Sequence, residues 1–414
     1  MSVTDVSERP VALQFLLTAL TGADPRATAE NMREGDWEQL LAHAHRHRVS
    51  VLLQQALARY GLLENRSPDI RTALTASARR ATFLGLEQHH ALSEIVGRFN
   101  ADATPLMLLK GAHLAHTVYQ QPACREMVDL DLLVRAEDMP RAIGLLEELR
   151  FVPTADYALD TELAFSQHIT PFRRGRVTVE LHWRLHLNEQ PHHTPLDSIW
   201  QRAEPIRVKT LDTLGLGRED LIIHLCVHAA SKHTLTVGLR PLLDVRAAVG
   251  RGGISWRLLL QRCDDWHARR PVALVLLVTH RLLGLEIPGR VERALNAFCD
   301  QGVVAAACER AVTLQPTMVP PIYARWAAGR ATADAVWASL ACHLSRTTTA
   351  HEYGLSTRSP VVPLLFVPRL VALLGRHGLR AARWILTQSA EKDAARDQDR
   401  LTQWLHHVER SSSA

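Results

Sequence analysis

The spacing of apolar residues divides the chain into two helical regions with a region of short strands between them. From residue 11 to about residue 100, and again from residue 217 onward, apolar residues recur at the intervals of amphipathic helices. In between, they form short runs or alternate with polar residues, which is typical of strands. The sequence therefore predicts an α+β fold, with a helical N-terminal region (1–100), a core (101–210) and a helical C-terminal region (211–414).

The core opens with a strand, a turn, a helix and a second strand between residues 105 and 134. The apolar run Leu106–Leu109 predicts a buried strand, and Lys110-Gly111-Ala112 predicts the turn that ends it. Gly111 has no Cβ, so the backbone at this turn can come close to a ligand such as a phosphate. Helical spacing follows up to residue 119, and Val128–Val134 predicts the second strand.

Two carboxylates lie on the second strand. Asp129 and Asp131 are two residues apart, so their side chains point to one face of a strand whose other residues are largely apolar. They repel each other unless a cation lies between them, and Mg²⁺ prefers such oxygen ligands. Glu180 lies in the alternating segment VTVELHW, with His182 on the same face. If the two strands are neighbours, three carboxylates converge, which suffices to hold two divalent ions about 3.5–4 Å apart.

Crowding of these carboxylates has a consequence for stability. Like charges held close together raise each other's pKa and destabilise the folded protein. Without metal, Asp131→Asn or Glu180→Gln is therefore expected to leave the protein as stable as before, or slightly more stable. For the same reason, nucleotide binding is expected to need Mg²⁺ or Mn²⁺.

The ordered motifs LKG, R-x-M-x-D-x-D-L-L-V and E-L-H-W resemble the bacterial uncharacterised nucleotidyltransferase family of the DNA polymerase beta-like superfamily. The positions that match the superfamily pattern are Gly111, Asp129, Asp131 and Glu180. Ala112 stands where the wider superfamily has serine, and Lys110 is characteristic of this branch. The resemblance implies a polymerase-beta-like nucleotidyltransferase core with a mixed sheet, flanked by helical regions.

The resemblance also implies a reaction, the metal-dependent transfer of a nucleoside monophosphate from a nucleoside triphosphate such as ATP to an acceptor hydroxyl. Asp129, Asp131 and Glu180 would be the catalytic residues and the ligands of Mg²⁺ or Mn²⁺. The residues implied in nucleotide binding are Lys110, Gly111, Ala112 and Arg125. Further possible substrate contacts are His182, His228, Lys232, Arg240 and Asp244. A small molecule, a modified peptide or a protein could be the acceptor, because such families are often encoded near genes of natural-product biosynthesis.

Two other functions stay open from the residues alone. The chain could be a nucleotide-binding or scaffold protein that kept the fold and lost catalysis, which Ala112 in place of serine supports. It could also transfer a phosphoryl group, since the site chemistry overlaps. The mass of the product separates the two enzymes, and binding of Mg²⁺-nucleotide without turnover would indicate the inactive protein.

Several of these residues also have structural explanations. Lys110 could be an exposed lysine at a strand end, and Arg125 could pair with an aspartate instead of a phosphate. His182 could orient a metal ligand, act as a base, or be a packed side chain. His224 and His228 lie one helical turn apart, but no third ligand is set by spacing, so a structural role or a place near the nucleotide is favoured over a zinc site.

Composition and charge refine this picture only slightly. The net charge of +5 suits an anionic substrate, whereas no dense run of Lys and Arg with interleaved aromatic residues indicates nucleic-acid binding. The six cysteines form no C-x-x-C pair, which favours reduced thiols and a cytoplasmic location. No signal-peptide pattern is evident, and prolines and Arg369 interrupt the apolar stretch from Val361, so neither secretion nor a membrane span is expected.

Overall fold

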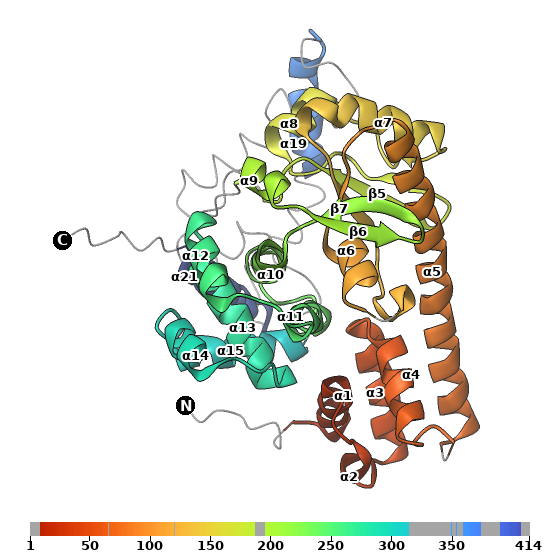
Figure 1. Cartoon of the computed structure of the whole chain (residues 1–414), viewed down its shortest axis with the longest axis vertical. Coiled ribbons are helices and arrows are strands. Elements are labelled where there is room, and N and C mark those ends of the chain that lie inside the picture. Colours follow the sequence, from red (N-terminus) through yellow and green to blue (C-terminus); the bar gives the residue numbers. More distant parts are fainter. Residues whose placement is uncertain are drawn as a thin grey trace, which may run out of the picture. The chain divides into compact units, whose positions relative to one another are not determined.

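The computed structural model describes residues 9–64, 66–119, 121–186, 195–313, 349, 353, 359–373 and 390–406 (Figure 1). The chain forms two compact units. The first comprises Met1–Val152 and Phe172–Leu314, and the second comprises Pro153–Pro171 and Gln315–Ala414. All residues expected in the site belong to the first unit. The division of the chain near residues 100 and 210 stays a prediction.

A seven-stranded sheet forms the centre of the first unit, in the order β3-β4-β5-β2-β1-β7-β6. The strands are β1 (Met107–Leu108), β2 (Leu130–Leu133), β3 (Val152–Pro153), β4 (Phe172–Arg174), β5 (Val177–His182), β6 (Glu204–Val208) and β7 (Leu211–Gly215). β2 pairs in parallel with β5, and β1 in parallel with β7, whereas β1 and β2 are antiparallel. This mixed sheet between helices confirms the predicted α+β fold.

The predicted N-terminal helices are present. They are α1 (Val11–Thr21), α2 (Arg26–Ala29), α3 (Glu34–Arg46), α4 (Ser50–Arg59) and α5 (Pro68–Ala101). α5 begins with a proline, whose fixed φ suits the first turn of a helix. Its 34 residues run from α3 and α4 to the sheet, where it contacts β5, β6 and β7 (Figure 1). α5 thus connects the N-terminal helices to the core.

Helix α9 (Leu196–Gln201) lies between β5 and β6 in the sequence. The helices that follow the sheet in the first unit are α10 (Arg218–Val227), α11 (Arg240–Gly250), α12 (Trp256–Asp265), α13 (Arg269–Leu283), α14 (Gly289–Asn296) and α15 (Gln301–Thr313). α13 is buried along nearly its whole length, because α10, α11, α12, α14, α15 and α1 all pack against it. A π-helical turn, His228–Lys232 (η4), extends α10. Helices were also predicted after about residue 290, and the parts of that prediction that fall on residues 314–348 and 374–389 lie outside the described residues.

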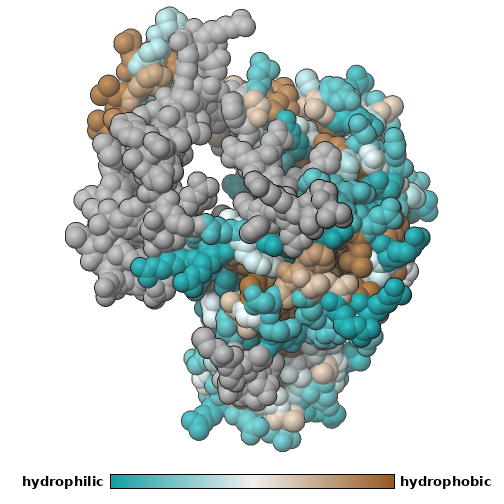
Figure 2. All heavy atoms as spheres, turned by 90° about the vertical axis from the view of Figure 1, so that its left-hand side faces the viewer, coloured by the Kyte–Doolittle hydropathy of each residue, from teal (hydrophilic) through white to brown (hydrophobic). Residues whose placement is uncertain are grey.

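The described helices of the second unit are α8 (Leu159–Phe165), η5 (Val362–Leu365), α19 (Phe366–Leu373) and α21 (Ala390–His406). Within the described part of the chain, no helix combines the length and the apolar character that crossing a membrane requires. On the face that Figure 2 shows, hydrophilic side chains cover most of the described surface, and apolar side chains lie in small groups.

The segment from β1 to β2 differs from the prediction in two details. The expected turn at Lys110 is already the first turn of helix α6 (Lys110–Thr117), which begins directly after β1. The strand expected from Val128 begins only at Leu130, because pairing with β5 starts there, opposite Val179. Asp129 therefore precedes the strand, and the simple two-residue alternation does not describe both aspartates.

Another side chain occupies the space beside Gly111. An added Cβ would lie 2.7 Å from Nη1 of Arg125 and 2.9 Å from Cγ and Sδ of Met127. The Arg125 side chain cannot easily move, because it is buried and forms a two-point ion pair with Asp244. Packing thus explains why position 111 is a glycine, independently of any bound phosphate.

We expect Gly111→Ala to lower the free energy of unfolding by roughly 1–3 kcal/mol, since overpacking displaces Arg125 or Met127. Gly144→Ala in α7 (Met139–Glu148) is the matched control, because an added Cβ there meets no atom within 4 Å and alanine favours a helix by about 0.5–1 kcal/mol. Urea denaturation measures both. Equal effects at the two positions would contradict the packing role of Gly111.

Candidate functional site

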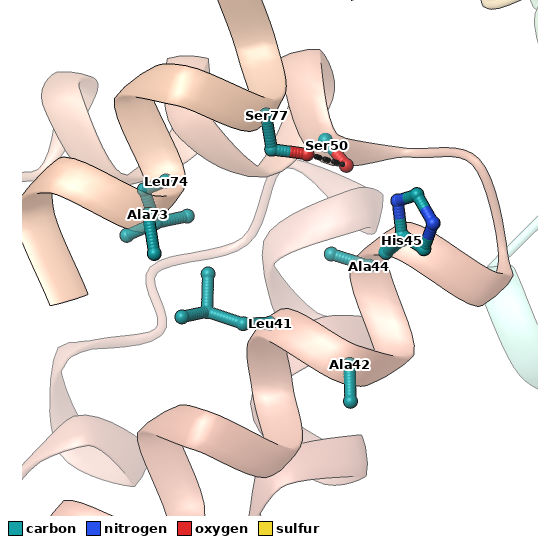
Figure 3. A pocket seen from close by; sticks show the side chains of 8 residues that line it. All are labelled: Leu41, Ala42, Ala44, His45, Ser50, Ala73, Leu74 and Ser77. Atoms are coloured by element: carbon teal, nitrogen blue, oxygen red, sulfur yellow. Dashed lines mark hydrogen bonds between the residues drawn. The ribbon is translucent and has the colours of Figure 1, made fainter.

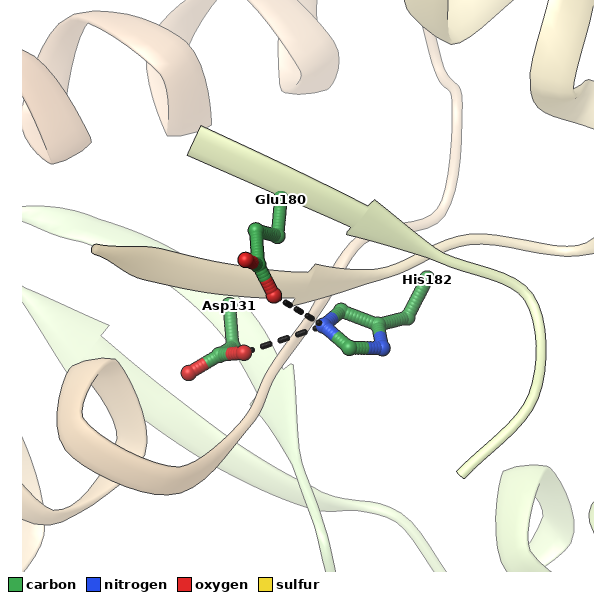
Figure 4. Close-up of side chains that lie close together, drawn as sticks. All are labelled: Asp131, Glu180 and His182. Atoms are coloured by element: carbon green, nitrogen blue, oxygen red, sulfur yellow. Dashed lines mark hydrogen bonds and ion pairs between the residues drawn. The ribbon is translucent and has the colours of Figure 1, made fainter. Parts of the chain in front are cut away.

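Neighbouring strands bring a carboxylate–histidine cluster together. In the parallel pairing of β2 with β5, Asp131 lies opposite Glu180. His182 lies two residues further along β5, on the same face as Glu180. Val177, Val179 and Leu181 of β5 are buried on the other face, as the alternation predicts. Asp131, Glu180 and His182 point toward one another (Figure 4), and one ligand atom of each lies within 4.8 Å of the others.

The same oxygen of Asp131 receives two contacts. His182 Nε2 lies 2.9 Å from Asp131 Oδ1, and 3.4 Å from Glu180 Oε2. Lys110 Nζ donates to Asp131 Oδ1 at 2.5 Å. The Lys110 and Asp131 side chains are only 10% and 5% exposed, so this ion pair is largely shielded from water. The structure thus rejects the exposed strand-end explanation of Lys110.

The backbone of Lys110 is held in an uncommon conformation. Its φ is +40°, in the left-handed region that a residue with a side chain rarely adopts. Such residues persist where the surroundings determine them and are often found at functional sites. Here the Leu109 N–H donates to the Asp131 carbonyl at 3.0 Å, so the backbone holds Lys110 beside its partner.

The two aspartates have opposite pKa shifts. Burial, together with the charges of Asp131 and Glu180, raises the pKa of Asp129 to about 6. Burial also acts to raise the pKa of Asp131, but Lys110 and His182 outweigh it and hold that pKa well below its ordinary value. The expectation that crowding raises both pKa values is therefore wrong for Asp131, because a lysine that the sequence did not place next to it compensates its charge.

Arg125 and Asp244 form a second buried ion pair. Arg125 Nη2 donates to Asp244 Oδ2 at 2.7 Å and Nε donates to Oδ1 at 3.2 Å. The Tyr119 hydroxyl also donates to Oδ1, at 2.8 Å. Arg240 donates to the carbonyl oxygen of Glu126. Of the two explanations of Arg125, the structure shows the pairing with an aspartate, and Asp244, only 2% exposed, is the partner of Arg125.

The π-helical turn after α10 carries further predicted residues to the site. Burial and the charge of Lys110 lower the pKa of Lys232, while Glu180, Asp131 and Asp129 act to raise it. Lys232 therefore lies in the field of the carboxylates. His228 packs against His233, with ring centroids 4.5 Å apart. π-Helical turns are rare and frequent at functional sites, which fits this placement.

Sequence reasoning missed the environment of His224. Its ring is buried, and neither ring nitrogen has a hydrogen-bond partner among the described residues. Burial first, and then the charges of His186 and Lys110, hold its pKa well below the ordinary value, so the ring is neutral. The H-x-x-x-H spacing indicated this histidine, but only the packing of α10 shows its surroundings. Tyr119 had no signal in the sequence, since its partner Asp244 is 125 residues away.

The donor set of the cluster fits a divalent ion. Ligand atoms of an octahedral ion with bonds of about 2.1 Å are separated by ~3 Å, close to the 2.9 and 3.4 Å found around His182 Nε2. Carboxylates suit Mg²⁺ and Mn²⁺, and an imidazole donor favours Mn²⁺ of the two. Asp129 lies outside this group of three, which instead contains His182.

A cavity of about 260 Å³ lies elsewhere in the first unit (Figure 3). Its lining comes from α3, α4 and α5 and is mainly apolar, with His45 at one side. Ser77 donates to Ser50 at 3.0 Å across this lining. None of the lining residues belongs to the carboxylate cluster, so the cavity does not form part of that site.

Comparison with known proteins gives one match. A family model described as an uncharacterised nucleotidyltransferase matches residues 33–284, more than half of the chain. The match includes the N-terminal helices from α3, the whole sheet and the helices up to α13. No curated protein and no solved structure matches the sequence.

We expect Asp129→Asn and Asp131→Asn to change stability in opposite directions at pH 7 in EDTA. The folded pKa of Asp129, about 6, exceeds its ordinary 3.8, so ionisation costs stability as pH rises between these values. Asparagine at 129 should add roughly 1–3 kcal/mol to the free energy of unfolding. Asparagine at 131 leaves Lys110 buried without its partner and should remove about 3 kcal/mol.

The pH dependence gives a second test of these assignments. The gain in the free energy of unfolding from Asp129→Asn should disappear as pH falls from 6 to below 4, because wild-type Asp129 then binds a proton in the folded state. Asp131 has a depressed pKa in the folded state. Its ionised carboxylate therefore contributes to the free energy of unfolding above its ordinary pKa of 3.8, and this contribution is lost as pH falls through the folded pKa. Urea denaturation across this range measures both. A shift of both variants in one direction at pH 7 would refute the assignment.

Proposed function

Because this chain belongs to the uncharacterised nucleotidyltransferase family, we propose that it transfers a nucleoside monophosphate from a nucleoside triphosphate to an acceptor hydroxyl. The observation that carries the proposal is the convergence of Asp131 and Glu180 from paired strands, with His182 beside them and Asp129 at the start of β2. This is the placement of carboxylates that nucleotidyl transfer needs.

Asp129, Asp131 and Glu180 would hold the divalent ion, with His182 as an additional donor. Bound there, Mg²⁺ or Mn²⁺ supplies positive charge where negative charge develops on the reacting phosphoryl oxygens. If His182 Nε2 gives its lone pair to the ion, the ring proton must sit on Nδ1. These residues are largely enclosed, which strengthens their electrostatic effect on a bound substrate.

The reaction is a displacement at the α-phosphorus. The acceptor oxygen forms a bond to this phosphorus, the bond to the bridging oxygen breaks, and pyrophosphate leaves. The proton of the acceptor hydroxyl passes to Glu180, which is less enclosed than Asp131. We assign the β- and γ-phosphates to Lys232, because it lies in the field of the carboxylates and is not the lysine paired with Asp131.

The helices around the site orient these groups. Arg125 and Asp244 connect the loop before β2 to α11, and Arg240 donates to the carbonyl of Glu126 in the same loop. In this proposal Arg125 and Asp244 are positioning residues, whereas the family resemblance implied nucleotide and substrate contacts for them. His228 stays assigned to substrate through its place on the π-helical turn beside Lys232.

The experiment is the transfer of label from α-³²P nucleoside triphosphates to a pool of hydroxyl-bearing metabolites, peptides and proteins, with Mn²⁺ present. Glu180→Gln and Asp131→Asn should reduce transfer at least about 100-fold, because charge in the transition state loses its compensation. Asp212→Asn is the matched control, since Asp212 is an exposed carboxylate that pairs with Arg207 at the surface.

Three results would contradict the proposal. One is transfer from γ-³²P but not α-³²P nucleotide, which would indicate a phosphoryl transferase. Another is nucleotide binding without transfer to any class of acceptor, which would indicate a protein that retains only binding. The third is unchanged transfer by Glu180→Gln in a variant that melts like the wild type.

A further inference from the structure

We infer that Lys110 permanently occupies one of the two cation positions of this site, so that the protein uses a single divalent ion. The inference rests on the proposed function and deepens it, because it states how many ions the site takes. In a two-metal site, two cations about 3.5–4 Å apart share a carboxylate. Here the ammonium of Lys110 already contacts the carboxylate of Asp131.

The geometry shows that Asp131 bridges two partners. Lys110 Nζ lies 2.5 Å from Oδ1, and His182 Nε2 of β5 lies 2.9 Å from the same oxygen. A divalent ion held by the proposed ligands, Asp129, Asp131 and Glu180 with His182, would therefore share Asp131 with Lys110. A second ion on the Lys110 side would have to displace an ammonium from a largely buried oxygen.

The chain offers Lys110 little freedom to move away. It is the first residue of α6, where the Lys110, Gly111 and Ala112 positions are all buried. Its backbone is held next to Asp131 by the Leu109–Asp131 hydrogen bond and by the antiparallel pairing of β1 with β2. Lys110 is enclosed together with the carboxylate that it neutralises.

Charge balance supports one ion. The carboxylates of Asp129, Asp131 and Glu180 carry three negative charges when ionised. Without nucleotide, one divalent ion and the Lys110 ammonium balance them, whereas two divalent ions with Lys110 exceed them by two charges. Lys232 is a further cation near the same carboxylates. It would then be available to pair with the negatively charged triphosphate.

Manganese binding tests the inference without any measurement of turnover. Wild-type protein with a non-hydrolysable nucleoside triphosphate analogue should bind one Mn²⁺ per chain in equilibrium dialysis, and its electron paramagnetic resonance spectrum should show an isolated ion. Lys110→Met removes the ammonium and keeps the length of the side chain. It should bind a second Mn²⁺ at least about tenfold more tightly than the wild type does, with a spin-coupled spectrum.

Lys209→Met is the matched control, because Lys209 is an exposed lysine in the turn between β6 and β7. It should behave as the wild type does. Two spin-coupled ions in the wild-type protein would overturn the inference and leave the proposed function intact. The wild-type measurement decides this even if Lys110→Met fails to fold. A folded Lys110→Met that still takes one ion would also overturn it.

The proposed function fails in a different way. Absence of label transfer from every α-³²P nucleotide, in a protein that binds one Mn²⁺, would reject the reaction and leave the metal count standing. Absence of any Mn²⁺ binding by the wild type would overturn the inference itself. The two ideas therefore stand or fall on separate measurements.

Discussion

Burial of a carboxylate between two others is possible only if positive charge faces it. Desolvation of an unpaired ion costs several kcal/mol, and neighbouring carboxylates add repulsion. Lys110 provides this charge for Asp131 at 2.5 Å, and His182 adds a second contact to the same oxygen. For Asp129, burial and the charges of Asp131 and Glu180 outweigh the charges of Lys110 and Arg125, and the pKa rises to about 6. The contacts of Lys110 and His182 with the Asp131 carboxylate are therefore the constraint on which the rest of the site depends.

A second buried ion pair connects the site to the helices behind it. Arg125 and Asp244 join the loop that leads into β2 to α11, and Tyr119 at the end of the α6 segment donates to the same carboxylate. The absence of a Cβ at Gly111 makes space for the Arg125 side chain. Two side chains that are 119 and 125 residues away in the sequence thus meet at Asp244.

The π-helical turn has a comparable effect on the other side of the site. A regular continuation of α10 would turn the residues after Val227 by a different angle, whereas the wider turn carries Lys232 into the field of the carboxylates. The histidines near this turn are neutral, because burial is the largest influence on the pKa of His224 and of His228 and lowers both. The cationic character of this part of the site therefore comes from lysines and not from histidines.

Local sequence by itself determined the elements and their chemistry. The alternation in VTVELHW predicts which face of β5 carries Glu180 and His182, and the motif order indicates the family that residues 33–284 match. Only the tertiary structure decided which side chains lie next to each other. The register of β2 against β5 sets Asp131 opposite Glu180, and chain folding over 119 residues brings Arg125 to Asp244. Periodicity describes where a side chain points along one element, whereas charge compensation depends on which elements become neighbours, and that choice is made by the packing of the whole core.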